Sequence, residues 1–313
     1  MWGHARLGAA PEYVHVVKVP ELSVVVPSVN GLGDLVGCLQ ALECQEGVLL
    51  EVIVVDRLGE GVRDTVRREF PGTVVLAAAH DNTIPEMRAL AFLNVNADSV
   101  AVIEDHVIVP PSWGRQLLDA LAGGADVVGG PIENAATNTL IDWASFLCEY
   151  SACLPPLPAG EATWLPGNNI VYRRHLLERF RPVIEEGKWE NRLHDAMRAD
   201  GIKLICRPEI VVGHKMHYTF SLYVSQRYYY ARSYAGARVA GASRGRKLFC
   251  GMAAFCLPPL LFFRTVRSVV AKRRHLGHLV ASLPLLAIFV TSWGIGEVIG
   301  YWFGSGTALS RVR

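Results

Sequence analysis

Three consecutive side chains of this sequence could bind a metal ion. Glu104, Asp105 and His106 come directly after a short apolar run, and they offer two carboxylates and one imidazole. Carboxylates are ligands for hard divalent cations, and imidazole binds Mn²⁺ and other transition metals. A further carboxylate, Asp56, follows an earlier apolar run. A site at these residues requires a fold that brings the ends of the two runs together.

Apolar runs alternate with helical patterns in the first part of the chain. The sequence predicts strands at 22–26, 52–55, 73–78 and 100–103, separated by helices at 33–42, 62–70 and 85–97. This alternation predicts an α/β fold with a parallel sheet and helices on both faces. In such folds ligands bind beyond the carboxyl ends of the strands, which is where Pro27, Asp56 and Asp105 stand.

The pattern becomes less regular after residue 110. The sequence predicts helices at 113–121 and 188–199, strands at 126–130 and 202–206, and a mixed aromatic stretch at 134–153. Seven cysteines without a Cys-x-x-Cys pair favour reduced thiols over a disulfide framework or a zinc site. Residues 1–20 lack the continuous apolar segment of a signal peptide. We therefore expect the α/β domain to lie in a reducing cytoplasm.

Charge is divided unevenly along the 313 residues, although the formal net charge is only +2. Residues 1–201 carry 15 basic and 27 acidic side chains, whereas residues 202–313 carry 16 basic and 2 acidic side chains. This asymmetry predicts that the C-terminal third meets phosphate, nucleic acid or an anionic membrane. A composition of 51% hydrophobic and 19% charged residues excludes a disordered chain.

Two apolar runs lie within the basic region. Run 279–303 contains one charge, Glu297, and is long enough to span a bilayer. Run 248–263 contains Pro258-Pro259, so a short span, a re-entrant segment and a buried core helix are all open. Because basic residues flank this run on both sides, we expect a re-entrant or interfacial segment here and one true span later. The apolar runs favour the membrane over nucleic acid as the partner.

The ordered strand-end motifs resemble the inverting glycosyltransferases of family 2, which have the Rossmann-like GT-A fold. The motifs are Pro27-Ser28-Val29-Asn30, Val54-Val55-Asp56 and Glu104-Asp105-His106. The resemblance covers about residues 20–235, and a membrane tail is common in a subset of the family. It implies an N-terminal extension (1–20), a GT-A domain with a mostly parallel sheet (21–235), and a membrane-associated region with C-terminal membrane helices (236–313).

The resemblance implies a site for a nucleotide-sugar donor. The implied donor-binding residues are Pro27, Asn30, Asp56, Arg88, Glu104 and Asp105. Asp56 stands where the family contacts the base, but Arg57-Leu58-Gly59 replaces the residues that usually follow, so the identity of the donor stays open. Arg88 stands on the helix before the fourth strand, where an Arg near the diphosphate is common, and a solvated helix face is the alternative.

The resemblance also implies a divalent cation, Mn²⁺ or Mg²⁺, that neutralises charge on the departing diphosphate. Asp105 is the implied first ligand, and His106 stands where the family usually has its last Asp. His214 follows a predicted strand at the place of a metal or diphosphate ligand, and His217 competes with it. The implied metal ligands are Asp105, His106 and His214.

An inverting transfer needs a general base near the acceptor hydroxyl. Aligning Leu193 and Gly201 with the corresponding helix of the family puts Glu190 at this position, next to Trp189. A carboxylate that is desolvated beside Trp189 would have a raised pKa. A first-turn acid stabilised by the helix dipole is the alternative explanation for Glu190, and Asp195 is the reserve candidate.

The segment around Gly167 matches the acceptor-side loop of the family. Trp164, Gly167 and Asn168 are the implied acceptor-side residues, although a simple turn would explain them as well. Arg227 and Arg232 loosely resemble an element of processive members. They could bind the donor diphosphate or a lipid phosphate, or lie on a basic helix that faces the membrane.

The resemblance and the tail together predict a membrane-anchored inverting glycosyltransferase with its catalytic domain on the cytoplasmic side. It would move a sugar from a nucleotide-sugar donor to a lipid-linked or envelope glycan acceptor. The alternative is a catalytically weak, membrane-bound scaffold that binds a sugar nucleotide. The departures at Arg57, His106 and Trp189 motivate this alternative. No nucleic-acid partner is expected.

Overall fold

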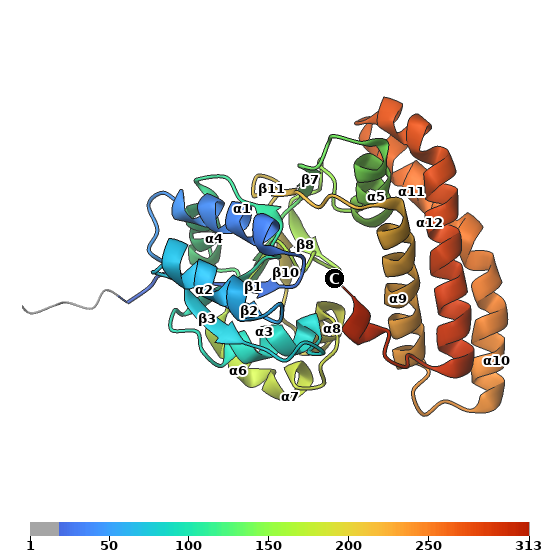
Figure 1. The fold of residues 1–313 in the computed structure, drawn as a ribbon, viewed down its shortest axis with the longest axis horizontal. Helices are drawn as coiled ribbons and strands as arrows, with labels where there is room; N and C mark the ends of the chain where they lie inside the picture. The colour runs from blue at the N-terminus through green and yellow to red at the C-terminus, as the bar shows by residue number, and fades with distance from the viewer. Residues whose placement is uncertain (1–18, 313) are drawn as a thin grey trace, which may run out of the picture.

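The computed structural model describes residues 19–312, so the predicted N-terminal extension lies almost entirely outside the described residues. Figure 1 shows an α/β domain with a layer of long helices beside it. The helices of this layer run side by side, and the last described residues return from them to the α/β domain. The predicted boundary at residue 235 falls inside one of these helices.

An eight-stranded sheet forms the centre of the α/β domain, with the strand order β3-β2-β1-β4-β9-β6-β10-β8. Its strands are β1 (Leu22–Ser28), β2 (Leu50–Asp56), β3 (Val74–Ala77), β4 (Ser99–Val102), β6 (Val127–Gly129), β8 (Gly160–Ala162), β9 (Ile170–Arg173) and β10 (Leu204–Cys206). The first four strands are parallel, whereas β9 is antiparallel to β4 and β6, and β8 is antiparallel to β10. The predicted α/β fold with a mostly parallel sheet is confirmed.

Helices cover both faces of this sheet because its strands are apolar on both sides. They are α1 (Leu32–Glu43), α2 (Glu60–Glu69), α3 (Ile84–Phe92), α4 (Trp113–Ala122), α6 (Arg174–Arg179), α7 (Arg181–Ile184) and α8 (Glu190–Ala199). Val24 and Val26 of β1 pack in one cluster with α1 and α4, and Val25 packs in another with α3 and α8. Helix α3 ends before the predicted residue 97 because the carboxylate of Glu51 binds the backbone N–H of Asn96.

A second sheet of three short strands lies at the carboxyl ends of the main strands. It consists of β5 (Val107–Ile108), β11 (Val212–His214) and β7 (Ile132–Asn134), in this spatial order. His214 pairs with Val107 across the antiparallel β5–β11 ladder. This register brings His214 next to His106, which lies 108 residues earlier in the chain.

The helical layer contains five helices and one 3₁₀ turn among the described residues. They are α5 (Leu140–Tyr150), α9 (Phe220–Arg238), α10 (Arg244–Ala253), the turn Ala254–Cys256, α11 (Leu257–Lys272) and α12 (Leu276–Phe303). Helix α12 lies between α9 and α10 in Figure 1. Contact with α9 is close because Gly300 lacks a side chain: a Cβ there would lie 2.6 Å from the carbonyl oxygen of Arg232.

The first apolar run, predicted to be a re-entrant or interfacial segment, lies in one continuous helical segment. Helix α10, the 3₁₀ turn and α11 form a helical segment of 29 residues, 244–272. Pro258 and Pro259 lie in the first turn of α11, where proline is tolerated, so the chain does not turn back there. By length and composition, both this segment and the 28-residue α12 are able to cross a membrane.

The chain after α12 returns to the α/β domain. A short 3₁₀ helix, Leu309–Arg311, precedes Val312, which is buried in the same apolar cluster as Val29 and Ile84. The carbonyl oxygen of Val312 accepts a hydrogen bond from Nη2 of Arg57 at 2.6 Å. The C-terminal segment therefore lies near the carboxyl ends of β1 and β2 (Figure 1).

Candidate active site

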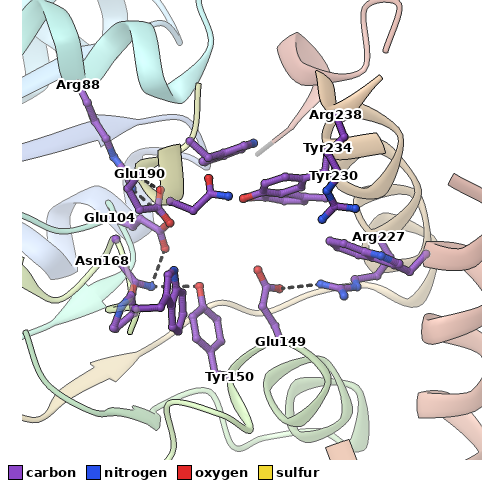
Figure 2. A pocket seen from close by; sticks show the side chains of 16 residues that line it. Arg88, Glu104, Glu149, Tyr150, Asn168, Glu190, Arg227, Tyr230, Tyr234 and Arg238 are labelled. Atoms are coloured by element: carbon purple, nitrogen blue, oxygen red, sulfur yellow. Dashed lines mark hydrogen bonds and ion pairs between the residues drawn. The ribbon is translucent and has the colours of Figure 1, made fainter. Parts of the chain in front are cut away.

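A cavity of about 400 Å³ lies between the α/β domain and the helical layer. Figure 2 shows Arg88, Glu104, Asn168 and Glu190 of the α/β domain on one side, and Arg227, Tyr230, Tyr234 and Arg238 of α9 on the other. Glu149 and Tyr150 of α5 and Trp293 of α12 also line the cavity. The helical layer therefore forms one wall of the candidate site.

Glu190 and Arg88 form an ion pair in this cavity. Glu190 is the first residue of α8, and its Oε2 accepts a hydrogen bond from Nη1 of Arg88 at 3.0 Å. Nη2 of Arg88 lies 3.8 Å from Oε1 of Glu104, so one guanidinium links the two carboxylates. Only 6% of Arg88 is exposed, which excludes a solvated helix face as the explanation for this residue. The fold thus brings Arg88, Glu104 and Glu190 together.

The loop before β9 packs directly against Glu190. A Cβ on Gly167 would lie 2.6 Å from Cδ of Glu190, so a residue without a side chain is needed for this approach. Nδ2 of Asn168 donates hydrogen bonds to Oε2 of Glu104 and to the hydroxyl of Tyr150, both at 3.0 Å. Trp164 lines the cavity and is 43% exposed. All three predicted acceptor-side residues therefore line the cavity.

Glu104, His106 and His214 form a group that could hold a metal ion. One ligand atom from each residue lies within 4.8 Å of the others. Nε2 of His106 is 2.8 Å from Nε2 of His214 and 3.3 Å from Oε2 of Glu104. Two imidazoles and one carboxylate fit Mn²⁺ or another transition metal better than Mg²⁺, which prefers oxygen ligands.

Asp105 lies behind this group and does not join it. Its carboxylate is fully buried and accepts hydrogen bonds from the backbone N–H groups of Val29 at 2.7 Å and Asn30 at 2.8 Å. Its Oδ1 is also 3.0 Å from Nδ1 of His106. Such a contact orients the imidazole so that Nε2 faces the metal position. Asp105 was predicted as a metal ligand; in this structure Glu104 lies with His106 and His214 in the group, and Asp105 contacts His106.

Glu104, His106 and His214 lie close enough to shift one another's pKa values. Burial opposes protonation of His106, but hydrogen bonds with Asp105 and Glu104 outweigh it and raise the pKa of His106 to about 10. Burial also opposes ionisation of Glu104, but the hydrogen bond and charge of His106 lower the pKa of Glu104 to about 2. Burial and the charge of His106 lower the pKa of His214. Glu104 and His214 are therefore in the protonation states that bind a cation.

Asp56 is not brought to the cavity. It is fully buried, and its carboxylate accepts hydrogen bonds from Ser28 Oγ and Arg63 Nη1 at 3.1 Å and from the backbone N–H groups of the loop that follows. Nη1 of the next residue, Arg57, donates to the carbonyl oxygen of Asn82 at 2.8 Å, and its Nη2 donates to Val312. These two side chains therefore bind their own chain in this structure.

Two other predicted donor residues lie beside the metal group. Pro27 and Asn30 line a small cavity of about 10 Å³ together with Glu104, His106 and His214. Nδ2 of Asn30 donates to Oδ1 of Asp105 at 2.7 Å. The end of β1 therefore approaches the metal group, whereas the end of β2 does not.

The two predicted phosphate-binding arginines have different positions. The guanidinium of Arg227 lies 4.1 Å from the ring centroid of Trp293 and 3.9 Å from Oε2 of Glu149, and it lines the cavity. Nε of Arg232 instead donates to the carbonyl oxygen of Gly304 at 3.2 Å, where α9 meets the end of α12. Arg227 is thus part of the candidate site, and Arg232 connects the two helices.

The two competing candidates from the sequence lie outside the cavity. Nδ1 of His217 is 3.2 Å from Oδ1 of Asp142, and the side chain of His217 is 42% exposed. Asp195 lies on α8 with 70% of its side chain exposed, 3.9 Å from Arg198. The geometry therefore favours His214 over His217 and Glu190 over Asp195.

Sequence reasoning missed the aromatic wall and the third carboxylate of the cavity. Tyr230, Tyr234 and Arg238 recur every four residues on α9, a spacing that puts them on one helical face. That periodicity was a usable signal. Glu149 and Tyr150 had no comparable pattern, because only the packing of α5 against the α/β domain brings them to the cavity. Burial raises the pKa of Glu149.

No protein-family model and no curated protein matches this sequence. Among solved structures, it is similar to the mannosyltransferase PcManGT from Pyrobaculum calidifontis in complex with GDP-Man and Mn²⁺. The TM-score is 0.55 at 16% identity, over 91% of this chain and 88% of that chain. The match to S. aureus TarS 1-349 has a TM-score of 0.47 at 16% identity, over 69% of this chain and 64%, less than two thirds, of that chain. The likeness to PcManGT shows a GT-A-like fold.

Proposed function

We propose that this protein is a membrane-anchored inverting glycosyltransferase that uses a nucleotide-sugar donor and a divalent cation. The observation that carries the proposal is the meeting of Glu190, Arg88 and the metal group Glu104, His106 and His214 around one cavity in a GT-A-like fold. The solved mannosyltransferase of similar fold contains GDP-Man and Mn²⁺. A nucleotide-sugar and Mn²⁺ are therefore the ligands to test first.

The proposed reaction is a single displacement at the anomeric carbon of the donor sugar. The acceptor oxygen forms the new bond while the bond to the diphosphate breaks, and the nucleoside diphosphate leaves with the electron pair. The carboxylate of Glu190 takes the proton of the acceptor hydroxyl. A cation held by Glu104, His106 and His214 would neutralise charge on the leaving group. Attack from the opposite face inverts the configuration.

Arg88 has two tasks in this proposal. Its ion pair with Glu190 orients that carboxylate before the proton transfer. Its position near Glu104 also adds positive charge on the side where Pro27 and Asn30 are proposed to meet the donor. We place the acceptor on the other side, between Gly167, Asn168 and the tyrosines of α9.

The helical layer supports the membrane part of the proposal. Two helical segments of 29 and 28 residues are apolar and long enough for a bilayer. Basic residues at the ends of the first segment favour the cytoplasmic face for the catalytic domain. A lipid-linked or envelope glycan acceptor is consistent with a cavity that has one wall in this layer.

A donor screen tests the proposed function. The purified full chain is incubated with Mn²⁺ or Mg²⁺ and with each common nucleotide-sugar, in membranes that contain native acceptor, and released nucleoside diphosphate is measured. We expect release with at least one donor and loss of release with a chelator. Binding of a donor without release would favour the second candidate, a catalytically weak sugar-nucleotide-binding scaffold. The hydrogen bonds of Asp56 and Arg57 to their own chain are the observation that favours it.

A further inference from the structure

One face of the segment 244–272 exposes large apolar side chains to solvent. They are Leu248, Phe249, Met252, Phe255, Leu260 and Phe263, and each is at least half exposed. The opposite face packs on α12: a Cβ at Gly294 would lie 2.6 Å from the ring of Pro258. The outer face is therefore a continuous apolar surface, which an ordinary soluble protein would cover.

The polar contacts inside the helical layer disfavour a bilayer around α12. The imidazole of His278 stacks on Trp143 with ring centroids 3.9 Å apart, and Trp293 lies against Arg227 of the cavity. Near the other end of α12, Glu297 pairs with Arg238, whose side chain is 55% exposed. A bilayer around α12 would surround these polar groups with hydrocarbon, where charged side chains are strongly disfavoured.

The charges of the outer helix also favour a surface position. Its uncharged run, 248–263, has 16 residues and is about 24 Å long, shorter than the hydrocarbon core of about 30 Å. Arg244, Arg246 and Lys247 precede this run, and Arg264 and Arg267 follow it. If this helix crossed the membrane, the basic cluster before the run and the basic cluster after it would lie on opposite sides. A helix in the membrane plane puts both at the same layer of anionic headgroups.

We propose that the helical layer lies in the plane of an anionic membrane surface, with the outer face of α10 and α11 inserted and no segment crossing the bilayer. This inference rests on the proposed membrane anchoring and replaces the expected span at 279–303. It places the cavity on the side of the helical layer that faces away from the membrane, because α12 and α9 lie between the cavity and the inserted face (Figure 1). A membrane-borne acceptor would then reach Glu190 from the side of α9.

Thiol labelling tests the absence of a crossing. Gly245, Gly277 and Thr307 are exposed and lie in the first turn of α10, in the first turn of α12, and after α12. Each is replaced by cysteine in a full chain that also carries Cys44→Ser and Cys256→Ser, and sealed inverted membrane vesicles are treated with an impermeant maleimide. We expect all three cysteines to react on the cytoplasmic side. Protection of Gly277→Cys until detergent is added would show two spans, and protection of Thr307→Cys would show one; either result overturns the proposal.

Vesicle binding tests the inserted face with a readout that does not depend on turnover. The full chain is floated with vesicles of phosphatidylglycerol and phosphatidylcholine and with vesicles of phosphatidylcholine alone. We expect the double variant Phe249→Gln/Phe255→Gln to lose about tenfold or more of its affinity for the anionic vesicles. Leu93→Gln, an exposed apolar residue of the α/β domain, is the matched control and should bind normally. Equal binding of both variants, or a soluble dimer that buries this face, would contradict the proposal.

Discussion

Glu190 shows how one residue can have both a structural and a chemical explanation. It opens α8, where a negative charge is stabilised by the helix dipole. It also lines the cavity, touches the position of Gly167 and pairs with Arg88. A capping role requires none of these contacts, so they favour the catalytic explanation.

Replacement of Glu190 by Gln separates these explanations. Gln keeps the size of the side chain but cannot take a proton at neutral pH, so we expect kcat to fall about 10²- to 10⁴-fold. Donor affinity, measured by calorimetry with Mn²⁺ present, should stay within about threefold, since Glu190 does not belong to the metal group. Asp195→Asn on the exposed face of α8 is the control and should leave kcat unchanged. Normal turnover of Glu190→Gln would exclude this residue as the base.

The metal group makes a second prediction for single residues. His214→Ala should weaken Mn²⁺ binding about tenfold or more, whereas His217→Ala should not, because His217 contacts Asp142 outside the group.

The pKa of His106 is raised to about 10, so a cation must displace its proton at neutral pH. Apparent Mn²⁺ affinity should therefore rise with pH between about 6 and 9. Titrations at several pH values check both statements, and a flat pH dependence would argue against His106 as a ligand.

The sequence could not decide which of the two carboxylates, Glu104 or Asp105, lies in the metal group. Both are carboxylates after the same strand, and the spacing alone favours neither. Their roles differ because Asp105 binds backbone groups of Val29 and Asn30, which come from a strand end about 75 residues earlier. Such a long-range partner is not visible in local sequence patterns.

At the scale of elements, the predicted strands of the α/β domain were the most accurate part. The apolar runs at β1, β2 and β4 are buried on both faces, so their composition is decided by burial and could be recognised directly. The end of α3 was predicted too late, because the contact of Glu51 with Asn96 is tertiary. Helix α5 was hidden in a mixed aromatic stretch, since it is buried on several sides and lacks a polar face.

Helix α8, which carries Glu190, makes an element-scale prediction for pH. His194 on this helix is 1% exposed, and its Nε2 is 2.8 Å from the hydroxyl of Tyr172 in β9. Burial and the charge of Arg88 lower the pKa of His194 from 6.5 to about 4. Between these values the unfolded chain binds a proton that the folded chain does not. Stability should therefore fall as the pH drops from about 6.5 to 4, by on the order of 3 kcal/mol from this group.

Chemical denaturation at pH 7 and pH 4.5 measures this loss. His194→Gln removes the titrating group and should make the free energy of unfolding less dependent on pH in this window. His175 on α6 is exposed, and His175→Gln is the matched control that should keep the full dependence. An identical pH dependence of His194→Gln and the unchanged protein would contradict the assignment.

At the scale of the whole molecule, the contact between α9 and α12 brings Trp293 to the wall of the cavity that α9 forms. The sequence indicated two apolar runs in a basic tail, but not that the tail would supply a wall of the site. The reason is that α12 reaches the cavity through its tertiary packing, including the contact with α9 at small residues such as Gly300. The composition of such a helix predicts a membrane partner, but it does not predict which of its residues contact α9 and the cavity.

Gly300→Leu should open this contact. The added side chain would meet the backbone of Arg232 and Cβ of Ala235 on α9. We expect α9 to shift, so that kcat/KM for the acceptor falls about tenfold or more while Mn²⁺ affinity of the α/β domain is kept. Gly277→Ala, at the exposed start of α12 with open space around it, is the control. Parallel loss of metal binding would instead indicate general unfolding.

The return of residues 309–312 to the ends of β1 and β2 has a practical consequence for producing the protein. A common route to a detergent-free sample is to cut the gene before the apolar tail. Here a cut at residue 235 would remove Arg238, Trp293 and the partner that Val312 provides for Arg57. In the shortened protein the cavity would be open to solvent on the side of the helical layer, and the surface that Val312 covers would be exposed. Its inactivity would then reflect missing parts of the site and not the loss of lipid.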